Sequence, residues 1–213
     1  MSILNEISEN LQIGRAKLVK ELVQRAVDEG YSAEQVLKDG LLRGMAVVGE
    51  RFKNNEIYVP EVLIAARAMN MGSEILRPLL ESTAVKSAGK VCLGTVQGDI
   101  HDIGKNLVRM MMESKGLEVI DLGVDVAPET FVSTAKEQGC QVICCSALLT
   151  TTMPVMDRVV ELAVQEGIRD KVKIMIGGAP VTEEYCIKIG ADAYTSDATS
   201  AAEKAAELCT QMQ

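Results

Sequence analysis

The sequence contains few aromatic residues and only one histidine. It has no Trp, two Phe and four Tyr, so a hydrophobic core must consist mainly of Leu, Ile, Val, Ala and the eleven Met residues. Structural zinc sites combine several Cys and His ligands at short spacing. No second His and no nearby Cys accompanies His101, so a zinc site of that kind is not expected.

An excess of positive charge is also lacking, since the formal net charge is −8 at pH 7. Nucleic acids and anionic membranes attract clustered Lys and Arg, so neither is expected as the main partner. No apolar run reaches the length of a membrane span, and the N-terminal "MSILNEISEN" does not have the basic and apolar segments of a signal peptide. We therefore expect a cytoplasmic protein without a membrane partner.

The cysteines lack the spacing of a metal or redox motif. None forms a C-x-x-C pair, and two of them lie inside an apolar run. Buried, reduced thiols are therefore predicted rather than a disulfide framework. The six are Cys92, Cys140, Cys144, Cys145, Cys186 and Cys209.

The first eighty residues have a helical pattern. Apolar residues recur at helical spacing over residues 14–30, 32–52 and 59–80. Gly30 is a typical stop for the first of these helices. Ser32 and Gln35 have the spacing of a capping box, and Pro60 lies where a first-turn proline is tolerated. Together with a short leading helix, these segments predict an all-α four-helix bundle.

From Lys90 onward, short apolar runs alternate with helical patterns. Strands are predicted over 90–96, 118–123, 141–149, 172–178 and 191–196, and helices over 104–116, 127–139, 152–167, 182–190 and 198–209. This alternation predicts an α/β Rossmann-like (flavodoxin-like) five-stranded parallel sheet with helices on both faces. The predicted domains are therefore 1–88 and 89–213, connected by a small, polar joint at Glu81–Gly89.

The single histidine lies in "GDIHDIGKN" (residues 98–106), in the loop after the first predicted strand. Ligands of parallel sheets bind beyond the carboxyl ends of the strands. The loops at that edge are 97–104, 123–128, 146–154, 177–180 and 196–198. The position of His101 therefore suggests a functional role.

Several known motifs do not fit this loop. A P-loop requires four residues between its glycines and a hydroxyl residue after the lysine, whereas five separate Gly98 from Gly104 and Asn106 follows Lys105. No G-x-G-x-x-G follows the first strand. Ser146 lies in "CCSALLT" and not in the G-x-S-x-G turn of a nucleophilic serine.

One histidine does suit a single axial bond to a metal whose other ligands come from a macrocycle. Asp99, two residues earlier, could accept the other ring N–H, which is common for ligating histidines. The alternative is a polar loop histidine paired with a neighbouring acid. Asp-x-His alone favours that alternative.

Three elements together resemble the cobalamin-binding signature of corrinoid proteins. They are Asp99-x-His101-x-x-Gly104, Ser146-x-Leu148 and Gly177-Gly178. Residues 105–145 and 149–176 separate them, and both gaps match the family's spacing. The preceding helices are similar to the helical cap of methyl-carrying members. The resemblance covers nearly the whole chain. It points to the corrinoid proteins of methanol, methylamine and related methyltransferase systems, and to the cobalamin module of methionine synthase.

The resemblance implies that His101 displaces the cofactor's dimethylbenzimidazole and binds cobalt. Asp99 would accept the other N–H of the imidazole, and Thr152 would extend this relay at a position where methionine synthase has Ser. Gly104 and the pair Gly177–Gly178 would leave room for the nucleotide tail. The implied cofactor-binding residues are Gly98, Asp99, Ile100, His101, Asp102, Ile103, Gly104, Ser146, Leu148, Thr150, Gly177, Gly178 and Ala179, with Phe52 and Val59 over the methyl-bearing face of the corrin.

The function implied by the resemblance is that of a methyl carrier, not catalytic alone. Cob(I)alamin would take a methyl group from a substrate-specific methyltransferase. Methylcobalamin would then pass it to a second methyltransferase that serves tetrahydrofolate, a thiol or another C1 acceptor. A reductive activase is a further candidate partner, and the cap would move at the joint to admit each partner.

Two other functions use the same loop motif. The cobalamin-binding subunit of an adenosylcobalamin-dependent mutase usually lacks the helical domain, so residues 1–80 count against that assignment. A cobalamin-based sensor that binds DNA would need a basic DNA-reading segment, which this acidic chain does not offer.

Overall fold

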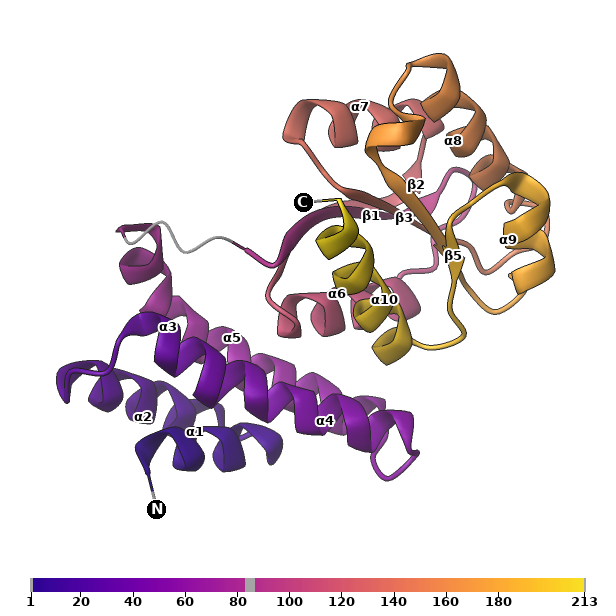
Figure 1. The fold of residues 1–213 in the computed structure, drawn as a ribbon. Coiled ribbons are helices and arrows are strands. Elements are labelled where there is room, and N and C mark those ends of the chain that lie inside the picture. Colours follow the sequence, from indigo (N-terminus) through magenta and orange to yellow (C-terminus); the bar gives the residue numbers. More distant parts are fainter. Residues whose placement is uncertain (1, 83–86, 213) are drawn as a thin grey trace. The chain divides into compact units, whose positions relative to one another are not determined.

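The computed structural model describes residues 2–82 and 87–212, apart from the side chains of residues 81 and 82. The chain divides into two compact units, Met1–Lys86 and Ser87–Gln213, each considered separately below (Figure 1). The predicted joint at Glu81–Gly89 includes residues 83–86, which lie outside the described residues. Within residues 2–82 and 87–212, no helix combines the length and the apolarity needed to cross a bilayer.

The first unit is helical, as predicted. Its elements are α1 (Ile3–Gln12), α2 (Ala16–Asp28), α3 (Ala33–Gln35), the π-helical stretch η1 (Val36–Leu42), α4 (Arg43–Lys53) and α5 (Val59–Ser82). The predicted capping box is present, because Ser32 and Gln35 each accept the other's backbone N–H through their side chains. The helix predicted over 32–52 contains a π-helical stretch that the sequence pattern does not reveal. Within it, Gly40 lies so close to α1 that an added Cβ would be 3.1 Å from Ile7 Cγ2.

The second unit is the predicted five-stranded parallel sheet, in the order β2-β1-β3-β4-β5. Its elements are β1 (Gly89–Val96), α6 (Ile103–Ser114), β2 (Leu117–Val126), α7 (Pro128–Gln138), β3 (Val142–Ser146), α8 (Pro154–Gln165), the 3₁₀ turn η2 (Arg169–Lys171), β4 (Lys173–Gly177), α9 (Glu183–Ile189), β5 (Ala193–Tyr194) and α10 (Ala198–Gln211). β5 is shorter than predicted. The chain leaves the sheet after it because Asp197 caps α10 by accepting the N–H of Ser200.

The strand order places a switch point between β1 and β3. From β1 the chain passes through α6 to β2 on one side, and then returns through α7 to β3 on the other side of β1. Right-handed crossovers in opposite directions place successive helices on opposite faces. Accordingly, α6 packs with α10 on one face and α7 with α8 on the other (Figure 1). The loops after β1 and β3 therefore diverge, which is where sheets of this class bind ligands.

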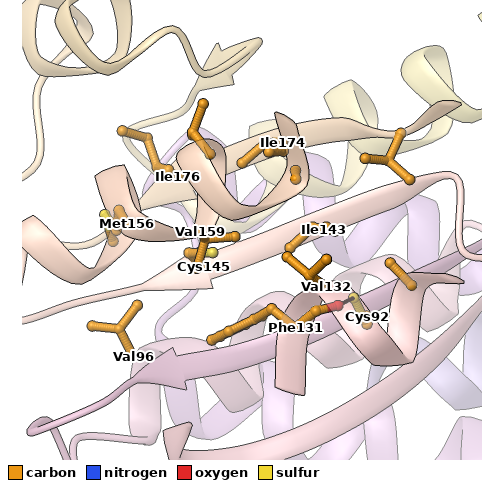
Figure 2. Packing of buried hydrophobic residues seen from close by; sticks show 14 of the residues in the cluster. Cys92, Val96, Phe131, Val132, Ile143, Cys145, Met156, Val159, Ile174 and Ile176 are labelled. Atoms are coloured by element: carbon orange, nitrogen blue, oxygen red, sulfur yellow. Dashed lines mark hydrogen bonds between the residues drawn. The ribbon is translucent and has the colours of Figure 1, made fainter. Parts of the chain in front are cut away.

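The core beneath α7 and α8 centres on Phe131, whose side chain is fully buried (Figure 2). Its ring lies against Gly94 of β1, where an added Cβ would be 2.9 Å from Phe131 Cζ. Cys92 donates its thiol hydrogen to the Phe131 carbonyl at 3.8 Å. All six cysteines are buried and free, so the prediction of buried, reduced thiols is confirmed.

Replacing Phe131 by Ala should lower the free energy of unfolding by about 3–5 kcal/mol, because it removes a buried ring and leaves a cavity. Chemical denaturation monitored by far-UV circular dichroism measures this. Ile187→Ala is the control in the same unit: its side chain is 72% exposed, and the loss should stay within about 0.5 kcal/mol. Equal losses for both variants would contradict this account of the core.

Candidate functional site

The loop between β1 and α6 places a buried acid next to a half-exposed histidine. The Asp99 side chain is fully buried, whereas 49% of the His101 side chain is exposed. His101 Nδ1 lies 2.7 Å from Asp99 Oδ1. The spacing Asp-x-His therefore places the two side chains in contact, as the sequence predicts.

Asp99 is the centre of a hydrogen-bond cluster that connects distant parts of the chain. Its Oδ1 accepts both His101 Nδ1–H and the His101 backbone N–H, the latter at 3.1 Å. Its Oδ2 accepts the backbone N–H groups of Leu148 at 2.7 Å and Leu149 at 3.2 Å. The Thr152 hydroxyl lies 3.1 Å from the same oxygen and 2.9 Å from the Leu149 carbonyl. With one hydrogen, it donates to one of these acceptors at a time.

These donors keep the buried carboxylate charged. Burial by itself would raise the pKa of Asp99. The hydrogen bonds to its two oxygens, led by that from Leu148, outweigh burial and hold the pKa well below its ordinary value. The site therefore presents a fixed negative charge directly behind the imidazole.

Two further residues hold the loop in place, and the sequence analysis did not identify either of them. Thr95 Oγ1 donates to the His101 carbonyl at 2.9 Å. Asp125, at the end of β2, accepts the Gly98 N–H at 2.7 Å and donates its own N–H to the Asp99 carbonyl at 2.9 Å. Asp125 has a φ of +53°, a backbone conformation uncommon for residues other than glycine. The only sequence signal was its position in the predicted strand-end loop 123–128.

The orientation of His101 leaves one nitrogen available. Asp99 accepts the Nδ1 hydrogen, so the neutral imidazole carries its lone pair on Nε2. Nε2 has no hydrogen-bond partner among the described residues. Residues 2–82 and 87–212 also hold no group of three or more His, Cys, Asp or Glu side chains able to bind a metal ion. A metal at His101 would therefore need ligands other than such a group of side chains.

A cavity of about 650 Å³ lies beside the imidazole. Its walls come from β1, β3, β4, α6 and α10 and from the loop after β5. Among the predicted site residues, those that line it are Ile100, His101, Asp102, Ile103, Gly104, Ser146, Leu148, Gly177, Gly178 and Ala179.

The other predicted site residues lie elsewhere. Asp99 and Thr152 are buried behind the imidazole, and neither Gly98 nor Thr150 is part of the cavity wall. Phe52 near the end of α4 and Val59 at the start of α5 belong to the first unit, where both are partly buried.

Two glycines of the cavity wall have different surroundings. An added Cβ at Gly104 would meet no protein atom within 4 Å, so it would occupy free space. Gly178 has a φ of +130°, and a Cβ there would collide with the Ala147 backbone. Only glycine therefore permits the close approach of the loops after β3 and β4.

Comparison with known proteins shows the family of this chain. A B12 binding domain model matches residues 89–206, and a second B12 binding domain model matches residues 3–77. A corrinoid protein of Desulfitobacterium hafniense is 40% identical over 98% of both chains, and a trimethylamine corrinoid protein of Methanosarcina acetivorans is 44% identical over 88% of both. The chain belongs to the family of B12-binding corrinoid proteins.

A solved structure agrees with this assignment. The methanol:cobalamin methyltransferase complex from Methanosarcina barkeri contains a chain that superposes with a TM-score of 0.88 at 28% identity, covering 98% of this chain and 80% of that one. The cofactor of this corrinoid protein is therefore cobalamin or a related corrinoid. The site fits such a group, because it combines one free imidazole nitrogen with a cavity of about 650 Å³ whose wall includes Gly104, Gly177 and Gly178.

Replacing Asp99 by Asn should destabilise the cofactor-free corrinoid protein by at least about 2 kcal/mol at pH 7, because an amide nitrogen would face N–H donors. The lowered pKa makes the contribution of Asp99 complete above the unfolded-state value of about 4 and progressively lost below it. The difference in free energy of unfolding between wild type and Asp99→Asn should therefore shrink as the pH falls below about 4. Urea denaturation across this range measures it.

Asp102→Asn is the matched control for that experiment. It removes the same charge from the exposed side of the loop, where Asp102 accepts only the Asn106 side chain at 3.0 Å. Its effect should remain within about 0.5 kcal/mol. An Asp99→Asn effect no larger than that of the control would disprove the stabilising role of the cluster.

Proposed function

We propose that the protein binds cobalamin with the dimethylbenzimidazole displaced from cobalt, that His101 Nε2 takes the vacated position, and that the loaded protein carries methyl groups between two methyltransferases. The observation that carries the proposal is the 2.7 Å contact between His101 Nδ1 and Asp99, which leaves Nε2 free. The corrinoid, when bound, supplies the centre that accepts and releases the methyl group.

The residues behind the imidazole would hold its orientation. Asp99 Oδ1 accepts the Nδ1 hydrogen, which leaves the Nε2 lone pair directed away from the carboxylate. The Thr152 hydroxyl can donate to Asp99 or turn to the Leu149 carbonyl. His101, Asp99 and Thr152 thus form a hydrogen-bonded chain from the half-exposed imidazole to a buried hydroxyl.

The cavity beside His101 would hold the displaced nucleotide tail. Its shape is set by Gly104, Gly177 and Gly178, and the Ser146 side chain offers a hydroxyl at its edge. Ile100 and Ile103 are 73% and 77% exposed, and Leu148 is 44% exposed. Exposed apolar side chains around a free imidazole would suit a large, flat macrocycle placed over them.

The relatives support a methyltransferase as partner. One relative, from Methanosarcina acetivorans, is named for trimethylamine, and a solved relative forms a complex named for methanol:cobalamin methyl transfer. By this likeness, a substrate-specific methyltransferase would load the protein, and a second methyltransferase serving tetrahydrofolate, a thiol or another C1 acceptor would unload it. A reductive activase would restore the cofactor after oxidation. Phe52 and Val59 would cover the methyl-bearing face of the corrin.

The single histidine permits a direct test of the axial bond. Protein labelled with [15N]histidine is reconstituted with cobalamin in its Co(II) form, and the electron paramagnetic resonance spectrum is recorded. Nitrogen-15 has a nuclear spin of one-half and nitrogen-14 a spin of one, so labelling should convert the ligand splitting from triplets to doublets. Triplets that persist in labelled protein would mean that benzimidazole still binds the metal. His101→Ala should lose the histidine splitting.

The carrier role is tested by methyl transfer. The loaded protein should restore transfer in a methyltransferase pair from which the corrinoid protein has been omitted, when supplied with methanol or a methylamine. His101→Ala should reduce the rate at least about tenfold, since the metal loses its protein ligand. Ser133→Ala, on the exposed surface of α7, should transfer like wild type. Full activity of His101→Ala would overturn the assigned role.

A further inference from the structure

The cavity beside His101 differs in chemistry between its edge and its depth. Ser146 and Gly177 pair across β3 and β4 at the carboxyl edge of the sheet. Two residues further from that edge, Leu93, Cys144 and Met175 form a second row in register across β1, β3 and β4. Successive side chains alternate between faces, so both rows lie on the face that the cavity occupies.

The two helices continue this apolar wall. α6 begins at the edge with Ile103, and Leu107 and Met112 lie about one turn and more than two turns deeper. Ala201 of α10 lies about one turn below the start of that helix. All three side chains are at least nine-tenths buried. The deep end of the cavity is therefore enclosed by Leu, Met and Ala on the helical side and by Leu, Cys and Met on the strand side.

Three charged side chains that line the cavity are already engaged, and one of them, Asp102, accepts the Asn106 side-chain N–H at 3.0 Å. Lys105 Nζ lies 2.5 Å from Asp121 Oδ1 and 2.9 Å from Asn106 Oδ1. Asp197 accepts the Ser200 N–H at the start of α10. Burial raises the pKa of the Cys144 thiol well above its ordinary value, so it stays a neutral, weak donor.

We propose that the deep end of this cavity selects corrinoids whose lower nucleotide carries a benzimidazole base over those that carry a purine base. This inference rests on the proposed function, because it assumes that the displaced tail lies in the cavity. A group that reaches the depth meets methyl groups, methylenes and thioethers. The ribose and phosphate of the tail would remain near the hydroxyl groups of Ser146, Thr195 and Ser196.

The physical reason is the cost of unpaired polar groups. The exocyclic amine of adenine and its additional ring nitrogens would lose their water without gaining a partner at the deep end. Dimethylbenzimidazole instead carries two methyl groups at the corresponding edge of the ring. The thioethers of Met112 and Met175 also make favourable contacts with aromatic rings.

Three ligands with the same corrin ring test the proposal. They are cobalamin, the adenine-containing cobamide, and cobinamide, which lacks the nucleotide. Dissociation constants are measured by titration of the cofactor-free protein, monitored by the corrin absorbance. Cobalamin should bind at least about tenfold more tightly than the adenine cobamide. Equal affinities for these two ligands would overturn the proposal.

Substitutions of Met175 test whether the base lies against the deep end of the cavity. Met175→Gln places an amide of similar size at the deep end, where it can pair with the polar groups of adenine. The ratio of the two dissociation constants, for the adenine cobamide and for cobalamin, should therefore fall. Met175→Leu keeps the wall apolar and should leave this ratio unchanged. Neither change should alter the affinity for cobinamide, which has no base to bury. If Met175→Gln folds, as judged by its thermal unfolding, and the preference is unchanged, the base does not lie against Met175 and the proposal fails. Met112→Gln provides the same test from α6.

The [15N]histidine spectrum separates this inference from the function on which it rests. Doublets with both cobamides, together with equal affinities, would leave the proposed function intact and refute the selection of the base. Triplets with cobalamin would refute the proposed function itself. Doublets together with a cobalamin preference that Met175→Gln narrows would support both.

Discussion

The Asp99 carboxylate is the interaction on which the site depends. A fully buried carboxylate is costly unless hydrogen bonds replace its water. Here the donors come from the loop after β1 and from the loop after β3, which are about fifty residues apart in the sequence. Because one charge binds both loops, the position of the imidazole and the shape of the adjacent backbone are fixed together. Loss of the charge would release both.

The sheet topology explains why a single acid can do this. The switch point between β1 and β3 brings their carboxyl ends side by side, with Thr95 paired to Ser146 in register. The loops leave in opposite directions, so a ligand can enter between them. Gly178 then lets the loop after β4 come against Ala147. Lys105 and Arg109 both bind Asp121 of β2, and these ion pairs connect α6 to the sheet.

Much of this could be predicted from the sequence, because the signals were local. The alternation of strands and helices, the capping box at Ser32 and the contact between Asp99 and His101 all depend on residues close together in the chain. What the sequence did not show depends on pairing between distant segments. Asp125 supports the loop because β2 ends beside it, and Thr95 does so because the chain turns back over β1. The π-helical stretch likewise contains a contact between distant segments, because Gly40 lies close to Ile7 of α1.

The relatives bear on which protein determines specificity for the methyl donor. Corrinoid proteins named for trimethylamine and for dimethylamine match this chain at 44% and 41% identity, a difference too small to separate the two groups. Both relatives are corrinoid proteins by name, although their names give different amines. The cavity described here is apolar at depth and faces one imidazole. Selection of the methyl donor would then fall to the partner enzyme, and selection of the corrinoid to residues such as Met112 and Met175. The partner's donor site and the deep end of this cavity would then lie on different proteins. Either could change in evolution while Asp99 continued to hold His101 in place.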